Sequence, residues 1–181
     1  MTAGRAIVLV ITAVAAVGFG LCQWFGVGMA WNGTESMPKG LYLSRPAGTV
    51  KAGDWVALCV PYSPQSDVFK SRGYLPLDSR CPAGIAPELK PIVASAGDTV
   101  EVKPKGIVVN GQAVLDSAIV ERDSRGEPIG HLPYGWKKTL GHGEFFALAT
   151  RVPRSLDSRY YGLVGQADIL AKVQPVFLFK E

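Results

Sequence analysis

Apolar residues form one long run near the start of the chain, and short apolar runs broken by glycine and proline follow it. The long run, Ala6–Val27, contains no charged side chain. As a helix its 22 residues would extend about 33 Å, enough to cross a hydrocarbon core of about 30 Å. Arg5 favours a cytoplasmic N-terminus, and Trp24 and Trp31 stand where interfacial aromatic residues belong. The pattern therefore predicts one transmembrane helix within residues 1–30.

Two other interpretations of this run stay open. "GMA" at Gly28–Ala30 has the small-x-small form of a signal-peptide cleavage site, although the run is longer than a usual signal-peptide core. A lipoprotein signal ending at Cys22 is disfavoured because Leu21 stands where a small residue is expected. If the run is an anchor, Cys22 is an unreactive small apolar residue.

The shorter runs predict one mainly β domain over residues 31–181, because they are rich in strand-forming residues and lack a long helical period. Asn110-Gly111 lies between two apolar runs and predicts a hairpin with a type I′ turn. One short helix is expected over Leu163–Leu170. The expected strands are Leu41–Leu43, Trp55–Val60, Pro91–Ala94, Thr99–Val102, Ile107–Val109, Ala113–Leu115, Phe145–Ala149 and Val173–Phe179.

The charge distribution argues against nucleic acid as a partner. The formal net charge is +4, and no run of lysine and arginine is dense enough to follow a phosphate backbone. Weak attraction to anionic lipid head groups is the simpler interpretation.

Two cysteines of the exported part, Cys59 and Cys81, are candidates for a disulfide, which an oxidising compartment permits. It would close a loop rich in proline, serine and glycine, so residues 61–88 are expected to form a variable excursion from the β core. A metal site is disfavoured because no CxxC occurs and His131 and His142 are far away in sequence. Both histidines are interpreted as solvated loop residues, and no cofactor is expected.

The segment "WNGTESMPKGLY", residues 31–42, contains a candidate nucleophile, Ser36. A serine hydroxyl needs a base to remove its proton. A lysine amine, with a reference pKa of about 10.4, serves only if burial lowers that value by about 3–5 units. Lys90 leads the apolar run "KPIVA", whereas the other lysines lie beside turns or charges or in the C-terminal segment. Lys90 is therefore the candidate base, and a strand-edge lysine is the alternative.

Three blocks in this order resemble the type I signal peptidases, a family of membrane-anchored Ser/Lys peptidases. They are "TESMPKGLY", "LKPIVASAGDTVEV" and "RSLDSRYYGLV", with the similar strand "KAGDWVAL" between the first two. The short chain and the form N-x-T-x-S-M-P-x-G-L-Y are similar to one branch, the TraF-type peptidases of conjugative transfer. The resemblance implies a signal-peptidase-like β core behind an N-terminal transmembrane helix.

The resemblance also implies a role for each matching residue. Ser36 matches the nucleophile, and Lys90 matches the base. The Thr34 hydroxyl and the Ser36 amide match the oxyanion hole. Ser155 matches a serine that orients the lysine, and Asp157 and Arg159 match a supporting ion pair, for which a solvated pair in a turn is the alternative.

The implied function is cleavage of membrane-tethered preproteins on the periplasmic side of the inner membrane. In the TraF-type branch the implied substrate is a conjugative pilin, in some systems closed head to tail, within a conjugation or type IV secretion apparatus. A general type I signal peptidase and a non-catalytic anchored assembly subunit are alternatives. A cytosolic self-cleaving repressor is disfavoured by the predicted anchor.

Overall fold

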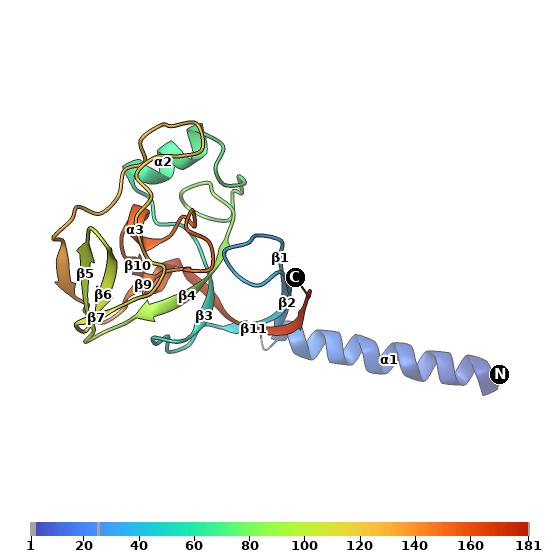
Figure 1. Cartoon of the computed structure of the whole chain (residues 1–181). Coiled ribbons are helices and arrows are strands. Elements are labelled where there is room, and N and C mark those ends of the chain that lie inside the picture. The colour runs from blue at the N-terminus through green and yellow to red at the C-terminus, as the bar shows by residue number, and fades with distance from the viewer. Residues whose placement is uncertain (1–2, 25, 181) are drawn as a thin grey trace.

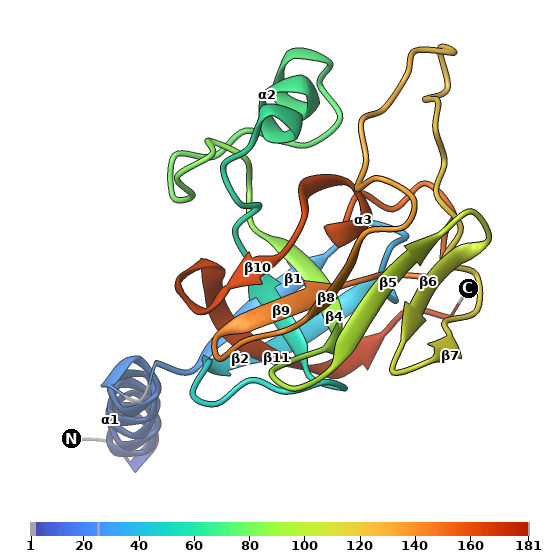
Figure 2. The ribbon, with the colours of Figure 1, turned by 90° about the vertical axis from the view of Figure 1, so that its left-hand side faces the viewer.

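The structure is a computed structural model, and it describes residues 3–24 and 26–180. The helix α1 (Ala3–Trp24) extends away from a β body that contains the other elements (Figures 1 and 2). No helix among the described residues was found to be long and apolar enough to cross a membrane. The predicted transmembrane helix is therefore not confirmed.

Parts of the predicted anchor lie outside the described residues. They include Phe25 and the side chains of Cys22 and Trp24, so the expectations for Cys22 and for an interfacial Trp24 stay predictions. Trp31 is described and is exposed on β1.

The body consists of two antiparallel sheets (Figure 2). The larger sheet has seven strands in the order β1-β2-β11-β3-β4-β9-β10, and the smaller has four in the order β7-β6-β5-β8. The strands of the larger sheet are β1 (Gly28–Asn32), β2 (Gly40–Pro46), β3 (Trp55–Leu58), β4 (Glu88–Ala94), β9 (Glu144–Ala147), β10 (Val164–Gly165) and β11 (Ile169–Leu178). Those of the smaller sheet are β5 (Thr99–Lys103), β6 (Gly106–Val109), β7 (Gln112–Ala113) and β8 (Lys137–Thr139).

Strand β4 contributes to both hydrophobic cores through inward-facing residues that alternate with less buried ones along the strand. Ile92 packs with the core of the larger sheet, beside Val56 and Leu58. Ala94 packs with the core that the smaller sheet covers, beside Val100. The residue two positions before Ile92 is Lys90, so the alternation places the lysine on the same inward face. A mainly β fold is thus confirmed.

Each expected strand overlaps an observed one, although the expected Ala113–Leu115 shares only Ala113 with β7. Strands β1, β8 and β10 were not expected. The first three residues of β1, 28–30, fall within the predicted anchor region, and its last two fall within the predicted domain. The hairpin at Asn110-Gly111 has positive φ at both residues, 51° and 81°, as a type I′ turn requires.

The expected helix over Leu163–Leu170 is wrong. Val164 pairs with Phe145 as β10, residues 166–168 form one 3-10 turn, and Ile169 begins β11. Gly162 ends α3 just before this segment and Gly165 interrupts it, which disfavours an α-helix here. The helices of the body are instead α2 (Pro64–Ser71) and α3 (Ser158–Tyr161).

The predicted disulfide between Cys59 and Cys81 is present, and both residues are buried. The segment between them is not wholly irregular, because it contains α2. Ser63 caps this helix by accepting a hydrogen bond from the Ser66 backbone N–H, and Phe69 is buried against the larger core. The cap and the buried ring explain a helix of eight residues in a proline-rich segment.

We predict that replacing both disulfide cysteines by alanine lowers the free energy of unfolding by about 3 kcal/mol. The bridged positions are 22 residues apart, and a cross-link over a loop of this size removes that much entropy from the unfolded chain. Urea unfolding of the full chain in mild detergent measures the change. The reduced wild type should match the variant, and a variant as stable as the oxidised wild type would contradict the prediction.

Candidate active site

Ser36 lies in the tight loop between β1 and β2, and the side chain of Asn32 holds this loop together. Asn32 is only 4% exposed. Its amide nitrogen donates to the carbonyls of Thr34, Met37 and Pro38 at 3.0–3.1 Å. Its oxygen accepts from the backbone N–H of Thr34 at 3.2 Å and from the Thr34 hydroxyl at 2.8 Å. One buried amide thus satisfies several backbone groups that would otherwise leave the loop unstable.

The loop rests on an apolar base where β2 meets β11. Met37, Tyr42 and Val173 are buried there together. Gly40 has φ of 155°, and a Cβ atom on it would lie 2.1 Å from the carbonyl oxygen of Phe177. Only glycine allows this close approach of the two strands. The glycine of "PKG" in the first block is therefore needed because the backbone of β11 passes directly beside it.

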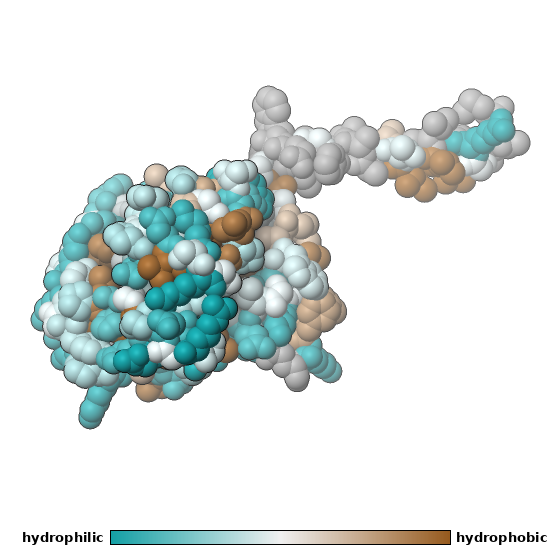
Figure 3. Space-filling view, turned by 90° about the horizontal axis from the view of Figure 1, so that it is seen from above, coloured by the Kyte–Doolittle hydropathy of each residue, from teal (hydrophilic) through white to brown (hydrophobic). Residues whose placement is uncertain are grey.

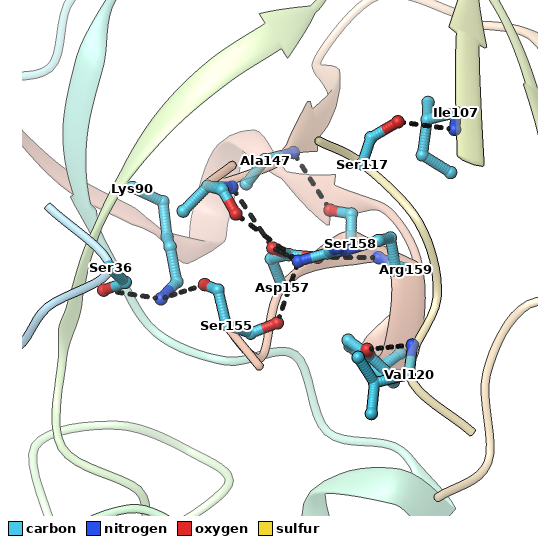
Figure 4. Close-up of polar contacts among 12 residues, drawn as sticks. Ser36, Lys90, Ile107, Ser117, Val120, Ala147, Ser155, Asp157, Ser158 and Arg159 are labelled. Atoms are coloured by element: carbon cyan, nitrogen blue, oxygen red, sulfur yellow. Dashed lines mark hydrogen bonds and ion pairs between the residues drawn. The ribbon is translucent and has the colours of Figure 1, made fainter. Parts of the chain in front are cut away.

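Lys90 extends from β4 toward Ser36, as Figure 4 shows. Its side chain is 2% exposed. The Nζ atom lies 3.3 Å from Ser36 Oγ and 3.4 Å from Ser155 Oγ. The structure therefore brings together three predicted site residues that are far apart in the sequence.

Thr34, the fourth predicted residue, lies next to Ser36, with 3.1 Å between the two hydroxyl oxygens. The oxygen of Asn32 can only accept, so the Thr34 hydroxyl donates to it. Between Thr34 and Ser36, the donor is then Ser36. In this arrangement the hydrogen bonds run from Lys90 through Ser36 and Thr34 to Asn32.

Asp157 and Arg159 form a fully buried ion pair, not a solvated turn. Arg159 donates to the two carboxylate oxygens from Nε at 2.8 Å and from Nη2 at 2.7 Å. It also donates to the backbone carbonyl of Ser155 at 3.1 Å. Burial alone would lower the pKa of Arg159, but the hydrogen bond and the charge of Asp157 outweigh it and raise the pKa.

Asp157 has two further structural roles. Its carboxylate accepts from the Ala149 backbone N–H at 3.1 Å, and it caps α3 by accepting from the Arg159 backbone N–H. The pair therefore joins the segment after β9 to α3 and fixes the backbone of Ser155 beside Lys90.

Sequence reasoning missed Glu88, which begins β4. Its Oε1 lies 3.5 Å from Lys90 Nζ. Its other carboxylate oxygen and the Tyr161 hydroxyl are buried, with no hydrogen-bond partner among the described residues. Burial raises the pKa of Glu88; the charge of Lys90 opposes this, and Asp157 adds to it. Two-residue spacing on a strand puts side chains on one face, and this signal could have revealed the residue.

The histidines have other surroundings. The ring of His131 contacts the Leu132 carbonyl and Tyr134, and His142 is exposed in a turn.

The cleft beside Ser36 is lined by Glu35, Lys39, Arg151 and Val152. A hydroxyl next to a buried amine at an open cleft is suited to acyl transfer.

The chain belongs to the signal peptidase, peptidase S26, family, whose model matches residues 1–178. The family that the sequence blocks indicated is thereby confirmed.

Several relatives carry names from conjugative transfer. The chain is 37% identical to a probable conjugal transfer protein TraF of Sinorhizobium fredii NGR234, over 92% of this chain and 85% of that protein. It is 32% identical to a plasmid transfer protein TraF of Escherichia coli, over 80% of each chain. A conjugal transfer protein TraF of Agrobacterium tumefaciens is also 32% identical, over 99% of this chain and 94% of the relative.

Among solved structures, a signal peptidase I from Enterococcus faecalis V583 is similar, with a TM-score of 0.39 and 18% identity. The match covers 71% of this chain and 99% of that one.

We predict that Asp157→Asn lowers the free energy of unfolding by about 3–5 kcal/mol, because it leaves the buried guanidinium of Arg159 without its counter-charge. Urea unfolding of the full chain in mild detergent measures the loss. Glu35→Gln is the matched control: its pair with Lys39 at 3.3 Å is exposed, and exposed pairs contribute little. An Asp157→Asn protein as stable as the control would show that the pair does not support the site.

Proposed function

We propose that the chain is a serine endopeptidase in which Ser36 is the nucleophile and Lys90 is its base. The observation that carries the proposal is the distance of 3.3 Å between the buried Nζ of Lys90 and Ser36 Oγ. Ser155 supports it, because a hydroxyl 3.4 Å from the same nitrogen keeps the amine directed at the nucleophile.

In the proposed reaction the neutral amine of Lys90 takes the proton of Ser36 while the oxygen attacks the scissile carbonyl. The Thr34 hydroxyl rotates from Asn32 toward the oxyanion, which the Ser36 backbone N–H also stabilises. Lys90 then gives the proton to the leaving amine, and an acyl-enzyme forms. Water releases a trimmed chain, whereas an amine of the substrate releases a ring.

The proposed substrate is a conjugative pilin precursor tethered to the membrane. The names of the relatives support this choice, since they are called conjugal or plasmid transfer proteins. We further propose that partners in a conjugation or type IV secretion apparatus present the precursor at the cleft.

The proposed location is the periplasmic face of the inner membrane, with α1 as the anchor. Exposed apolar residues on α1 support this proposal, and Figure 3 shows some of them in brown. Strand β1 and the C-terminal end of β11 with the residue after it also expose apolar side chains: Met29, Trp31, Val176, Phe177, Leu178 and Phe179. The rings of Trp31 and Phe179 lie 5.3 Å apart. Aromatic residues of this kind favour a membrane interface, and the disulfide fits an oxidising compartment.

We predict that Ser36→Ala and Lys90→Met each lower the rate of pilin processing by at least about a thousandfold, because each removes one member of a pair that works as a unit. Co-expression with the precursor, followed by mass spectrometry, measures the product. A ring is lighter than the trimmed linear chain by one water, so the same spectrum distinguishes the two outcomes.

Two matched controls accompany these variants. Ser71→Ala removes an exposed serine on α2, and Lys103→Met removes a half-exposed lysine on β5. Both control variants should process the pilin precursor at the wild-type rate. If the Ser36 and Lys90 variants fold and process like these controls, the chain is not a Ser/Lys peptidase and a non-catalytic assembly role takes its place.

We predict that Thr34→Val lowers kcat by about a hundredfold or more, the usual effect of removing one oxyanion donor. Thr34→Ser should restore most of the rate because it keeps the hydroxyl. Single-turnover cleavage of a precursor peptide measures both rates. Equal rates for the valine and serine variants would exclude this role of Thr34.

A further inference from the structure

The amino group of Lys90 has three polar neighbours at similar distances. They are Ser36 Oγ at 3.3 Å, Ser155 Oγ at 3.4 Å and Glu88 Oε1 at 3.5 Å. The proton of Ser36 is directed at Thr34, because the Thr34 hydroxyl donates to the oxygen of Asn32. Ser36 therefore accepts from Lys90. With the Ser155 hydroxyl and the Glu88 carboxylate as the other two acceptors, the neighbours match the three N–H groups of an ammonium.

This arrangement describes a resting site in which Lys90 is charged and unable to act as a base. The charge needs a partner because an isolated buried ammonium is very unfavourable. Among the described residues, Lys90 forms its ion pair with the carboxylate of Glu88. The opposing residues on β3, Val56 and Leu58, are apolar.

Glu88 is itself in a poor environment for a negative charge. The residue is 13% exposed by its side chain, and its second oxygen has no hydrogen-bond partner among the described residues. Asp157, the N-cap of α3, and Tyr161, its last residue, lie near Glu88, and the negative charge of Asp157 raises the pKa of Glu88 in addition to burial. Because Arg159 is hydrogen-bonded to Asp157, its positive charge is already compensated.

We propose that Glu88 is the counter-ion and proton acceptor of Lys90: it keeps the lysine protonated in the resting site and receives its proton when substrate binds. The proposal rests on the proposed function and assigns Glu88 as a positioning residue that acts through Lys90. It makes the pH at which the peptidase becomes active a property of this pair.

The proton that Lys90 loses is the one that Glu88 gains, so the transfer needs no other group. One N–H bond of the Lys90 ammonium breaks and one O–H bond forms on the Glu88 carboxylate, so an ion pair becomes a neutral amine and a neutral acid. A bound substrate favours this transfer because it excludes water and turns Thr34 toward the oxyanion. The Ser36 proton is then directed at the lone pair of Lys90, and the later steps leave the proton on Glu88 unchanged.

Glu88→Gln tests the proposal because glutamine has nearly the same shape and no charge. We expect the acidic limb of the pH–rate profile for precursor cleavage to move to higher pH by about one unit or more, because the variant must lose the Lys90 proton to solvent, whereas the wild type keeps that proton on Glu88. Processing near neutral pH should be slower than in the wild type. A profile that superimposes on the wild type would overturn the proposal.

Glu101→Gln is the matched control. Glu101 and Lys103 have the same two-residue spacing on β5 and the same distance of 3.5 Å, but the lysine is 49% exposed. This variant should leave the profile unchanged. Urea unfolding of both variants separates a change in the base from a loss of fold, because reduced stability lowers the rate without moving the limb.

A second measurement needs no substrate. The full chain labelled with ¹³C at the lysine Cε is titrated by NMR in detergent, and the Lys90 signal is assigned by its loss in Lys90→Met. The Lys90 signal should titrate at lower pH in Glu88→Gln than in the wild type, and an unchanged titration would refute the coupling. If Ser36→Ala processes normally while this signal moves, the proposed function fails and the Glu88–Lys90 coupling alone survives.

Discussion

The site depends on one amino group that is held away from water. Lys90 is on the inward face of a strand whose next inward residues belong to two hydrophobic cores. Packing of these neighbouring inward residues therefore determines where the Lys90 Nζ lies, and the side chain has little room to reach solvent. The proposed base thus lies in the part of the fold that is hardest to rearrange.

Two polar networks complete the site from opposite sides. Asn32 organises the loop of Ser36 through its amide, and the Asp157–Arg159 pair fixes the backbone of Ser155. Neither network touches the other directly in the contacts described, and each orients one neighbour of Lys90. Misplacing reacting groups by about an ångström is enough to lower rates strongly, so both networks matter to the proposed chemistry.

The sequence predicted the class of fold and the elements that carry the motifs, because alternation and turn residues are local signals. It also placed Ser36, Lys90 and Ser155 in one candidate site, which the structure brings together. It did not reveal Asn32 or Glu88, since a polar residue is informative only once its burial is known. The helix α2 was missed because its stability comes from a cap and a buried ring.

Strand β11 pairs with both β2 and β3 in the finished sheet. The hairpin bearing Ser36 and the strand next to that of Lys90 are therefore joined through a segment that follows both of them in the chain. Contacts so distant in the chain form slowly. Ser36 and Lys90 are thus brought together only once β11 has inserted between β2 and β3, so the geometry of the candidate site depends on completion of the sheet.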